Sequence, residues 1–386
     1  MTTTAVDAAI VGGGVIGLAS AWRLTQRGLR VAVIDPNPAH AATHAAAGML
    51  APVSEVTYGE TALLEFAMAS LARYPDFVAD LEHSTGMTVG LRRDGTLVVA
   101  TDAGDREMLA ELHAFQTRLG LTATMLGSRE CRELEPTLAP EVRCGLLVAT
   151  DHSVDNRKLA AALQAAIYAD PASEVVLDQV TSILVEDGHA TGISLASGAE
   201  VRADWVVLAA GPWSNAIAGV PDDARPPVRP VKGEILRLHG HPPLPAPTRS
   251  VRALVNGSDM YVVPRADGEI VVGATVQDAG FDTTVRVGAV RELLRDARTV
   301  LPVIDEYRLV ETTAALRPGS PDNAPMIGKT SVDGLVVATG HYRNGILLAP
   351  VTADLVAAAM TATDTESDRA LLDLVSPRRF AKAVTA

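Results

Sequence analysis

The sequence predicts an α/β protein in which a discontinuous dinucleotide-binding domain carries an inserted second domain built on a largely antiparallel sheet. Two observations predict this fold class. Apolar strands end at glycines near residues 12, 211 and 340, far apart along the chain. The stretches between these points carry hairpin signals instead. Because parallel strands of nucleotide-binding sheets end in glycine-rich loops, we expect the three junctions in one domain.

The chain length allows two domains of ordinary size. Its 386 residues are 48% hydrophobic and 20% charged, which is typical of a globular protein with a substantial core. We expect residues 1–85, 145–220 and 312–375 to form the dinucleotide-binding domain, and residues 86–144 and 221–311 to form the second domain.

The N-terminal unit is the clearest motif in the chain. It reads in the order strand, glycine motif, helix, strand and acid: Ala8 to Val11, G-x-G-x-x-G at Gly12, Gly14 and Gly17, a helix from Val15 to about Arg27, Leu29 to Ile34, and Asp35. A glycine motif alone is weak evidence, but this complete order predicts a dinucleotide site.

Each part of the motif has a physical reason. Gly12 lets the chain turn tightly out of the strand, and Gly14 lets backbone N–H groups approach a pyrophosphate at the positive end of the helix. Gly17 allows close packing of the helix on the strands. Asp35 stands where an acceptor for ribose hydroxyls belongs. The motif leaves open which dinucleotide binds.

The remaining elements follow from periodicity and turn signals. We expect helices from Gly59 to Leu81 (broken or kinked at Pro75), from Ala103 to Leu119, from Ser128 (a short one), after a cap at Asp155 or Asn156, and from Val287 to Leu301. We expect strands at Gly145–Thr150, Val175–Leu184, Thr191–Leu195, Glu200–Arg202, Trp205–Ala210, Val231–Leu238 and Gly334–Thr339. We also expect a hairpin arm from Arg92 to Thr101 around Asp94 and Gly95, and a hairpin of Met260–Pro264 with Glu269–Ala274.

Composition narrows the function classes. A net charge of −13 without a basic block argues against a nucleic-acid partner. Cys131 and Cys144 lack metal-ligand spacing, so we expect reduced structural thiols. The N-terminus does not read as a signal peptide, and no apolar run reaches about 18 residues. We therefore expect a cytoplasmic protein without a membrane span, and the sequence leaves a homo-oligomer open.

The rest of the chain favours a flavin over a nicotinamide. No histidine-centred acid–base constellation follows the cofactor motif, the nine histidines are scattered, and we predict no metal site. A flavin accepts a hydride from an amine or hydroxy acid with little help beyond positioning. A second glycine loop, from Gly340 to Gly345, precedes an apolar helix whose positive end suits a reduced flavin, although ordinary helix packing gives the same pattern.

Two arginines and a tyrosine are candidates for the substrate site. Arg343 lies in the second glycine loop, where a planar guanidinium can bind a carboxylate beside the cofactor. Arg317 lies between proline and glycine turns, and a solvated surface role is a stronger alternative for it. Tyr261 begins a hairpin strand, where half-buried packing is the commoner use. Lys232 stays unassigned.

At this point the sequence resembles the FAD-dependent D-amino-acid-oxidase superfamily, and within it the glycine oxidases of thiamine thiazole synthesis. The resemblance spans roughly residues 6 to 360. Its motifs are IVGGGVIG (Ile10–Gly17), AAAGMLAP (Ala45–Pro52), PVKGE (Pro230–Glu234), YVVPR with GAT (Tyr261–Arg265 and Gly273–Thr275), LRPGSPDNAPMIG, and GHYRNGILLAP (Gly340–Pro350).

The resemblance implies a Rossmann-like FAD-binding domain, non-covalent FAD, and specific contacts. Arg343, Arg317 and Tyr261 would be the catalytic and substrate-binding residues, with Val276 also at the substrate. The cofactor-binding residues would be Gly12, Gly14, Val15, Ile16, Gly17, Asp35, Pro36, Thr43, His44, Ala47, Gly48, Met49, Val180, Gly211, His341, Tyr342, Asn344, Gly345, Ile346 and Leu347. Two departures from the family pattern are His44, in place of a small hydroxyl residue, and Val276, in place of a methionine.

The implied reaction is oxidative deamination of glycine, and of other small amines such as sarcosine or D-alanine, by hydride transfer to flavin N5. Oxygen would be the acceptor, and glyoxylate, ammonia and hydrogen peroxide the products. Three alternatives stay open: an oxidase of sarcosine or D-amino acids, a quinone-linked D-amino-acid dehydrogenase, and a non-catalytic flavoprotein subunit.

Overall fold

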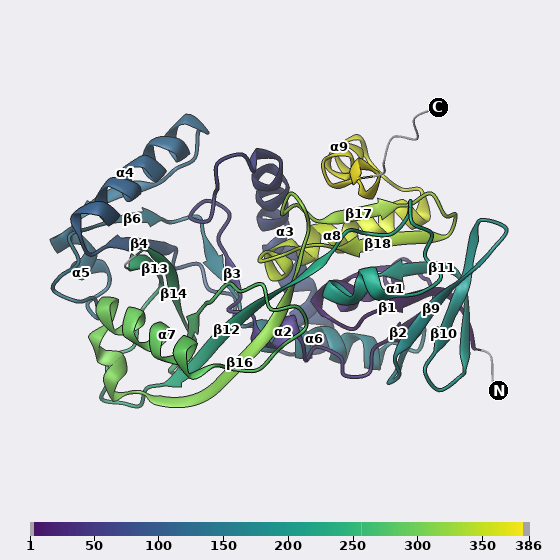
Figure 1. The fold of residues 1–386 in the computed structure, drawn as a ribbon, viewed down its shortest axis with the longest axis horizontal. Helices are drawn as coiled ribbons and strands as arrows, with labels where there is room; N and C mark the ends of the chain where they lie inside the picture. Colours follow the sequence, from purple (N-terminus) through teal and green to yellow (C-terminus); the bar gives the residue numbers. More distant parts are fainter. Residues whose placement is uncertain (1–3, 256, 381–386) are drawn as a thin grey trace.

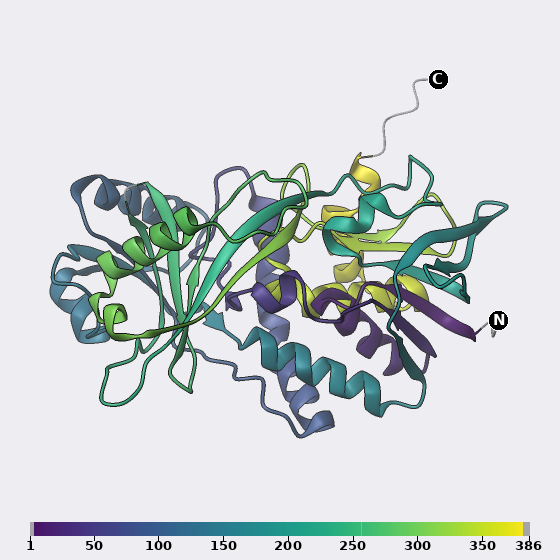
Figure 2. The ribbon, with the colours of Figure 1, turned by 60° about the horizontal axis from the view of Figure 1, so that its bottom comes forward.

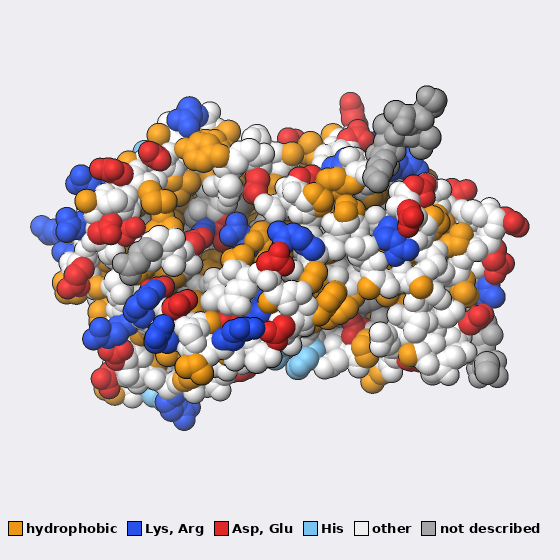
Figure 3. Space-filling model, viewed as in Figure 1, with side chains coloured by type: hydrophobic (Ala, Val, Ile, Leu, Met, Phe, Trp, Pro, Cys, Tyr) orange, Lys and Arg blue, Asp and Glu red, His pale blue; other side chains and the backbone are white. Residues whose placement is uncertain are grey.

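Two eight-stranded sheets lie side by side along the long axis of the molecule (Figure 1). The computed structural model describes residues 4–255 and 257–380. Helices pack mainly around the first sheet and along the border between the sheets, as the rotated view shows (Figure 2). Basic and acidic side chains are interspersed over the face seen in Figure 3.

The first sheet is built on parallel strands. Five of them, β18, β11, β1, β2 and β8, run parallel, and β17, β10 and β9 join antiparallel. The order is β17 (Met326–Lys329), β18 (Leu335–Thr339), β11 (Glu200–Leu208), β1 (Thr4–Val11), β2 (Val31–Ile34) and β8 (Ser173–Val176), with β10 (His189–Leu195) on β11 and β9 (Val180–Glu186) on β10.

The central strand β1 is buried on both faces. Ala8 and Ile10 belong to a core shared with five helices, whereas Ala9 and Val11 belong to a second core on the opposite face. A strand that is covered on both sides reads as a continuous apolar run, which is why its sequence does not alternate. The five helices are α1 (Val15–Thr25), α3 (Thr61–Thr85), α6 (Asn156–Ala169), α8 (Gly345–Thr361) and α9 (Glu366–Val375).

The second sheet is antiparallel except for one pair, β13 with β4, among the described strands. Its order is β16 (Arg308–Gly319), β12 (Arg229–His239), β15 (Glu269–Gly273), β14 (Ser258–Pro264), β13 (Ser250–Val255), β4 (Thr96–Ala100), β6 (Cys144–Val148) and β5 (Thr124–Gly127). The helices α4 (Ala103–Arg118), α5 (Ser128–Leu134) and α7 (Val287–Val300) accompany it (Figure 1).

Short elements complete the chain. They are α2 (Ala42–Ala45), the pair β3 (Met49–Leu50) and β7 (His152–Ser153), the 3-10 helices η1 (Gly211–Ala216), η2 (Pro302–Glu306) and η3 (Pro377–Phe380), and α9 (Glu366–Val375). The predicted fold class is confirmed, as are the N-terminal strand–helix–strand unit and the β14–β15 hairpin.

Several local expectations are wrong. The stretch around Asp94 and Gly95 is not a hairpin, because β4 pairs with β13 and β6, which are distant in sequence. Glu200–Arg202 and Trp205–Ala210 are not separate strands, because β11 runs from Glu200 to Leu208, and Val175–Leu184 divides into β8 and β9. β8 pairs with the distant strand β2, whereas β9 pairs with its neighbour β10, which is why this stretch divides.

The helix α3 continues through Pro75, so of the predicted break or kink, the break is wrong. Tertiary contacts hold it on both sides of the proline. The Tyr74 hydroxyl donates to the carbonyl of Ile346 at 3.0 Å, and the Ser70 hydroxyl donates to that of Leu347 at 2.7 Å. Phe77 packs edge-on against Trp22, with ring centroids 5.2 Å apart. The two hydrogen bonds tie α3 to the first turn of α8, and the aromatic contact ties it to α1.

Sheet membership differs from the predicted domain division at two strands. The prediction assigns residues 145–148 and 312–319 to the dinucleotide-binding domain, and in the structure these residues lie in β6 and β16, which pair within the second sheet. Cys131 and Cys144 are buried and not bonded to each other.

Within the described residues, no single helix is both long enough and apolar enough to cross a membrane. Only α8 taken together with residues 366–380 has that length and composition, and these two segments are bent by 109° relative to each other.

Candidate active site

A cavity of about 710 Å³ lies where the carboxyl ends of β1, β2, β11 and β18 face strands β12, β14 and β16 of the second sheet. Most of the predicted site residues line it, although they come from segments more than 300 residues apart. They are Gly12, Gly14, Val15, Ile16, Asp35, Pro36, Thr43, Ala47, Gly48, Met49, Val180, Gly211, Tyr261, Arg317, His341, Tyr342, Arg343, Gly345 and Ile346.

At one end of the cavity, backbone N–H groups and a carboxylate surround the start of α1. Gly12 has a φ of +107°, and a Cβ there would lie 2.5 Å from the carbonyl oxygen of Ala209. The Asp35 carboxylate accepts from the N–H of Gly13 and of Asn37, both at 2.7 Å. No acidic residue occupies the first turn of α1. The positive end of this helix is therefore available to an anion.

The segment that carries Thr43 is held against α1 by its own hydroxyl. The Thr43 Oγ1 atom accepts a hydrogen bond from the N–H of Val15 at 2.9 Å. This contact caps the helix from a segment 28 residues away, and it places Thr43 and Gly14 side by side at the cavity wall.

A buried polar cluster, which we call the Asn156 clamp, fixes the chain from Thr43 to Ala47. The Asn156 amide nitrogen donates to the carbonyl oxygens of Thr43 at 2.7 Å and His44 at 3.1 Å. Its amide oxygen accepts from Arg237 at 3.3 Å and Arg265 at 3.1 Å. Arg265 also donates to the carbonyl of Ala47 at 2.7 Å. Sequence reasoning missed this cluster because its members lie on α6, β12 and the β14–β15 turn.

The loop between β18 and α8 forms the opposite wall. His341 is buried, its Nε2 lies 3.0 Å from the hydroxyl of Thr352, and burial lowers its pKa to about 3. The ring is therefore neutral at pH 7. Gly345 and Ile346 open α8 at the cavity, with no acidic residue in the first turn. A second helix N-terminus thus faces the cavity.

Two glycines make room for the side chains of Arg317 and Tyr261. A Cβ on Gly233 would lie 2.2 Å from the Arg317 Nη1 atom, and one on Gly273 would lie 2.3 Å from the Tyr261 hydroxyl oxygen. Gly233 and Gly273 are on the adjacent strands β12 and β15. The guanidinium of Arg317 and the hydroxyl of Tyr261 therefore pack directly over the two glycines, where no side chain stands in the way. Burial raises the pKa of Tyr261 to about 12.

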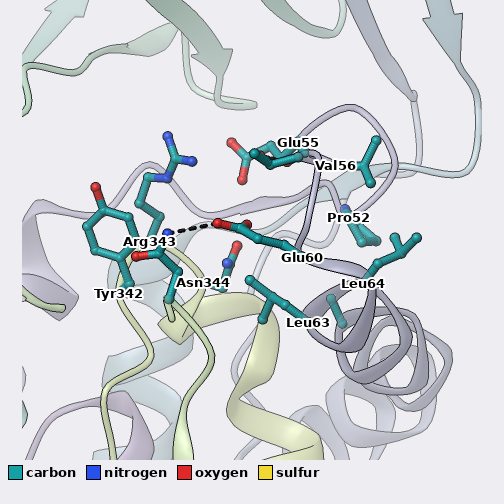
Figure 4. Close-up of a pocket in the computed structure, with 12 residues that line it drawn as sticks. Pro52, Glu55, Val56, Glu60, Leu63, Leu64, Tyr342, Arg343 and Asn344 are labelled. Carbon is teal, nitrogen blue, oxygen red and sulfur yellow. Dashed lines mark hydrogen bonds between the residues drawn. The ribbon is translucent and has the colours of Figure 1, made fainter. Parts of the chain in front are cut away.

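The cationic groups at this end have no carboxylate partner within 4.0 Å among the described residues. Arg317 donates only to backbone carbonyls, at 3.1 Å to Thr275 and 3.4 Å to Lys232. Arg343 is exposed, and its guanidinium lies 5.3 Å from the centroid of the Tyr342 ring. Figure 4 shows Arg343 and Tyr342 beside a small side pocket that Glu55, Glu60 and Asn344 also line.

Comparison with known proteins decides the family. A family model described as FAD dependent oxidoreductase matches residues 7–359. The chain belongs to this family. Its cofactor is therefore FAD, as the sequence predicts.

The relatives match the predicted resemblance. The bifunctional protein ThiO/ThiG of Trichormus variabilis is 34% identical over 91% of this chain, which spans about half (52%) of that relative's length. Glycine oxidase of Geobacillus kaustophilus is 34% identical, over 95% of this chain and 96% of its own. The crystal structure of glycine oxidase from that organism superposes with a TM-score of 0.86 at 33% identity, covering 94% of this chain and 96% of the other. Iminodiacetate oxidase from Chelativorans has a TM-score of 0.81 at 27% identity, covering 93% and 96%.

The cavity fits FAD. Its volume is within the range of sites for large ligands. The N-terminus of α1 would hold the pyrophosphate, the Asp35 carboxylate the ribose, and the loop from His341 to Ile346 the flavin ring. A Cβ on Gly48, which has a φ of +75°, would lie 2.0 Å from the carbonyl oxygen of Val154, so only glycine lets the backbone run this close beside the cavity.

Five predicted residues do not line the cavity. Gly17 packs α1 on β1, since a Cβ there would lie 1.9 Å from the Gly12 carbonyl oxygen. His44 turns outward to the Glu311 carboxylate at 3.3 Å. Leu347 is buried in the core, and Asn344 lines only the side pocket. Val276 is 57% exposed, because its neighbours bond to β12 and leave it on the outer side.

Sequence reasoning also missed wall residues on both sides of the cavity. Glu55, Trp213, Gly233 and Ile235 line it, together with Asn37, Ala39, His40, Gln179, Thr181, Ala216 and Ile217. The PVKGE motif contained the one usable signal: a glycine inside a strand often marks a close approach of another group. Lys232, left unassigned, is fully buried and pairs with Glu234 at 3.2 Å on the face away from Gly233.

Proposed function

We propose that this protein is an FAD-dependent oxidase of glycine and other small amino acids, such as sarcosine and D-alanine. It would form glyoxylate, ammonia and hydrogen peroxide from glycine and would serve thiamine thiazole synthesis. The observation that carries the proposal is the pair Arg317 and Arg343, two guanidinium groups at one end of an FAD-sized cavity without a carboxylate partner within 4.0 Å among the described residues. The similarity to glycine oxidases supports the same assignment.

In this proposal the chain contributes position and charge. Arg343 and Arg317 bind the substrate carboxylate, a charge-assisted and geometrically directed contact. The Tyr261 hydroxyl, protonated at neutral pH, donates a hydrogen bond at the same end. Bound FAD supplies the hydride acceptor. With the carboxylate fixed, the α-carbon and the neutral amine are oriented, and orientation is the main contribution to rate.

The test is reduction of the flavin by substrate without oxygen. The purified holoenzyme is mixed anaerobically with glycine, sarcosine, D-alanine or D-proline, and its visible spectrum is recorded before air is admitted. We expect bleaching by glycine and rapid recovery with hydrogen peroxide in air. A flavin that no amino acid bleaches would contradict the oxidase assignment. Bleaching followed by slow recovery in air would instead indicate a dehydrogenase with another electron acceptor.

A further inference from the structure

We propose that Glu55 is a specificity-determining residue that excludes amines with a second carboxylate from the substrate end of the cavity. This inference rests on the proposed function, because it places the substrate's first carboxylate at Arg343 and Arg317. It goes further by assigning a chemical limit on the substrate and the residue that imposes it.

Glu55 lies where the main cavity and the side pocket meet. It lines the main cavity together with Arg317, Arg343 and Tyr261, and it also lines the side pocket behind Arg343. In Figure 4 its carboxylate points toward the Arg343 guanidinium across the open space. A substrate bound to Arg343 therefore extends past a fixed negative charge.

The carboxylate of Glu55 is held by a buried cation. Arg252 Nη1 lies 3.4 Å from Glu55 Oε1 and donates to the carbonyl of Ser54 at 3.0 Å. The N–H of Ser54 and of Val53 in turn donate to the buried Asp151 carboxylate. These contacts fix both the side chain and the turn that carries it.

Arg252 does not neutralise Glu55 completely. Its other nitrogen, Nη2, pairs with Asp259 at 2.8 Å, so two carboxylates share one guanidinium. The group formed by Glu55, Arg252 and Asp259 therefore carries a net negative charge, and Glu55 is the member of the group that lines the cavity. Partly buried charges are screened weakly, so this charge acts on anything bound nearby.

The charges then select among substrates. One carboxylate of the substrate is attracted to Arg343 and Arg317. A second carboxylate on the amine or the α-carbon would reach toward Glu55 and be repelled, whereas an uncharged substituent of the same size would not. Rejection by a like charge is an established way to build specificity.

The experiment compares two N-substituted glycines of equal shape. Iminodiacetate carries a branched carboxymethyl group on nitrogen, and N-isobutylglycine replaces its two oxygens with methyl groups. We measure kcat/KM for each with the wild-type holoenzyme, with Glu55→Gln and with Glu60→Gln. We expect Glu55→Gln to raise the ratio of kcat/KM for iminodiacetate to kcat/KM for N-isobutylglycine about tenfold or more, which is the effect expected of one like-charge contact. Glu60→Gln is the matched control, because Glu60 lines only the side pocket and accepts from Asn323 at 2.8 Å.

An unchanged ratio in Glu55→Gln, with glycine oxidation retained, overturns the inference. If no amine reduces the flavin of the wild-type protein, the proposed function is overturned instead.

If Glu55→Gln does not bind FAD, the wild-type protein supplies the measurement. Malonate and isovalerate are titrated into it at low and at high salt, and binding is followed by the flavin absorbance. We expect added salt to weaken isovalerate binding more than malonate binding, because salt screens both the attraction to the arginines and the repulsion by Glu55. Equal salt dependence of the two ligands overturns the inference by this second route.

Discussion

The cofactor end and the substrate end of the cavity are built in different ways. The cofactor end is mostly backbone from one local unit, in which Gly12, Gly14 and Asp35 lie within 25 residues and follow a spacing imposed by helix and strand geometry. The substrate end is mostly side chains from β12, β14, β16 and two loops. A motif can encode the first, because its contacts are local. The second exists only after the sheets have paired.

The comparison indicates that substitutions at the two ends have different effects on the fold. At the cofactor end, added volume collides with backbone that cannot move. At the substrate end, we expect that a side chain can be removed without disturbing the fold. Three substitutions test this difference and a fourth tests the neighbouring contact between α6 and β16, in order of decreasing expected effect.

The largest effect is expected for Gly17→Ala. Its Cβ would lie 1.9 Å from the Gly12 carbonyl oxygen, so α1 must move away from β1. We expect a loss of about 3 kcal/mol in the free energy of unfolding and loss of FAD from the purified protein. Gly28→Ala is the control: Gly28, unlike Gly17, has a positive φ of +81°, but nothing lies within 4 Å of the added Cβ, so the substitution should cost only about 1 kcal/mol and the variant should retain FAD. Equal loss of FAD in both variants would contradict the view that the collision with the Gly12 carbonyl oxygen causes the loss.

Arg343→Ala tests the substrate end. Removing the guanidinium should raise the KM for glycine roughly 100-fold, the value of a charged bidentate contact, and leave the flavin absorbance unchanged. Steady-state oxygen consumption and the visible spectrum measure the two quantities. Arg129→Ala, an exposed residue paired with Glu133, is the control and should change neither. An unchanged KM would mean that the carboxylate binds elsewhere.

Asn156→Ala tests whether buried side chains, and not the glycine motif alone, shape the cofactor end. The change removes the Asn156 donor from the carbonyls of Thr43 and His44, of which only that of His44 keeps other donors, Arg157 and Arg237. It also removes an acceptor of Arg237 and Arg265. We expect a loss of about 2 kcal/mol in the free energy of unfolding and a weaker FAD affinity, measured by urea denaturation and by fluorescence titration. The exposed Asn215→Ala should change neither, and a silent Asn156→Ala would show that the clamp is dispensable.

The smallest effect is expected for Glu311→Gln, at the contact between α6 and β16. The hydrogen bond from Arg157 lowers the pKa of Glu311 to about 2 from its usual 4.5. Because the folded-state pKa is depressed, the stabilisation is complete above pH 4.5 and disappears as the pH falls toward 2. Partial exposure screens this pair, so we expect about 1 kcal/mol at pH 7 and no difference near pH 2. Unfolding curves of both proteins across this range test it, with Glu133→Gln as the exposed control; a difference that persists at pH 2 would contradict the assignment.

The sequence by itself determined the cofactor end and the fold class. Strand, glycine spacing, helix and Asp35 follow from local geometry, and apolar runs such as Ala8–Val11 report burial on both faces. Tyr261, Arg317 and Arg343 were candidates from their positions in the sequence, the resemblance supplied their roles at the substrate, and the structure brings all three to one cavity.

Only the tertiary structure decided the rest. β4 and β6 are placed by non-local pairing, which turn signals at Asp94 and Gly95 do not report. The Asn156 clamp and the position of Glu55 depend on segments that meet only when the two sheets pack together. The orientation of Val276 depends on which residues of its loop bond to β12. Local sequence specifies dihedral preferences and burial, but the partner of a side chain is set by the packing of distant segments.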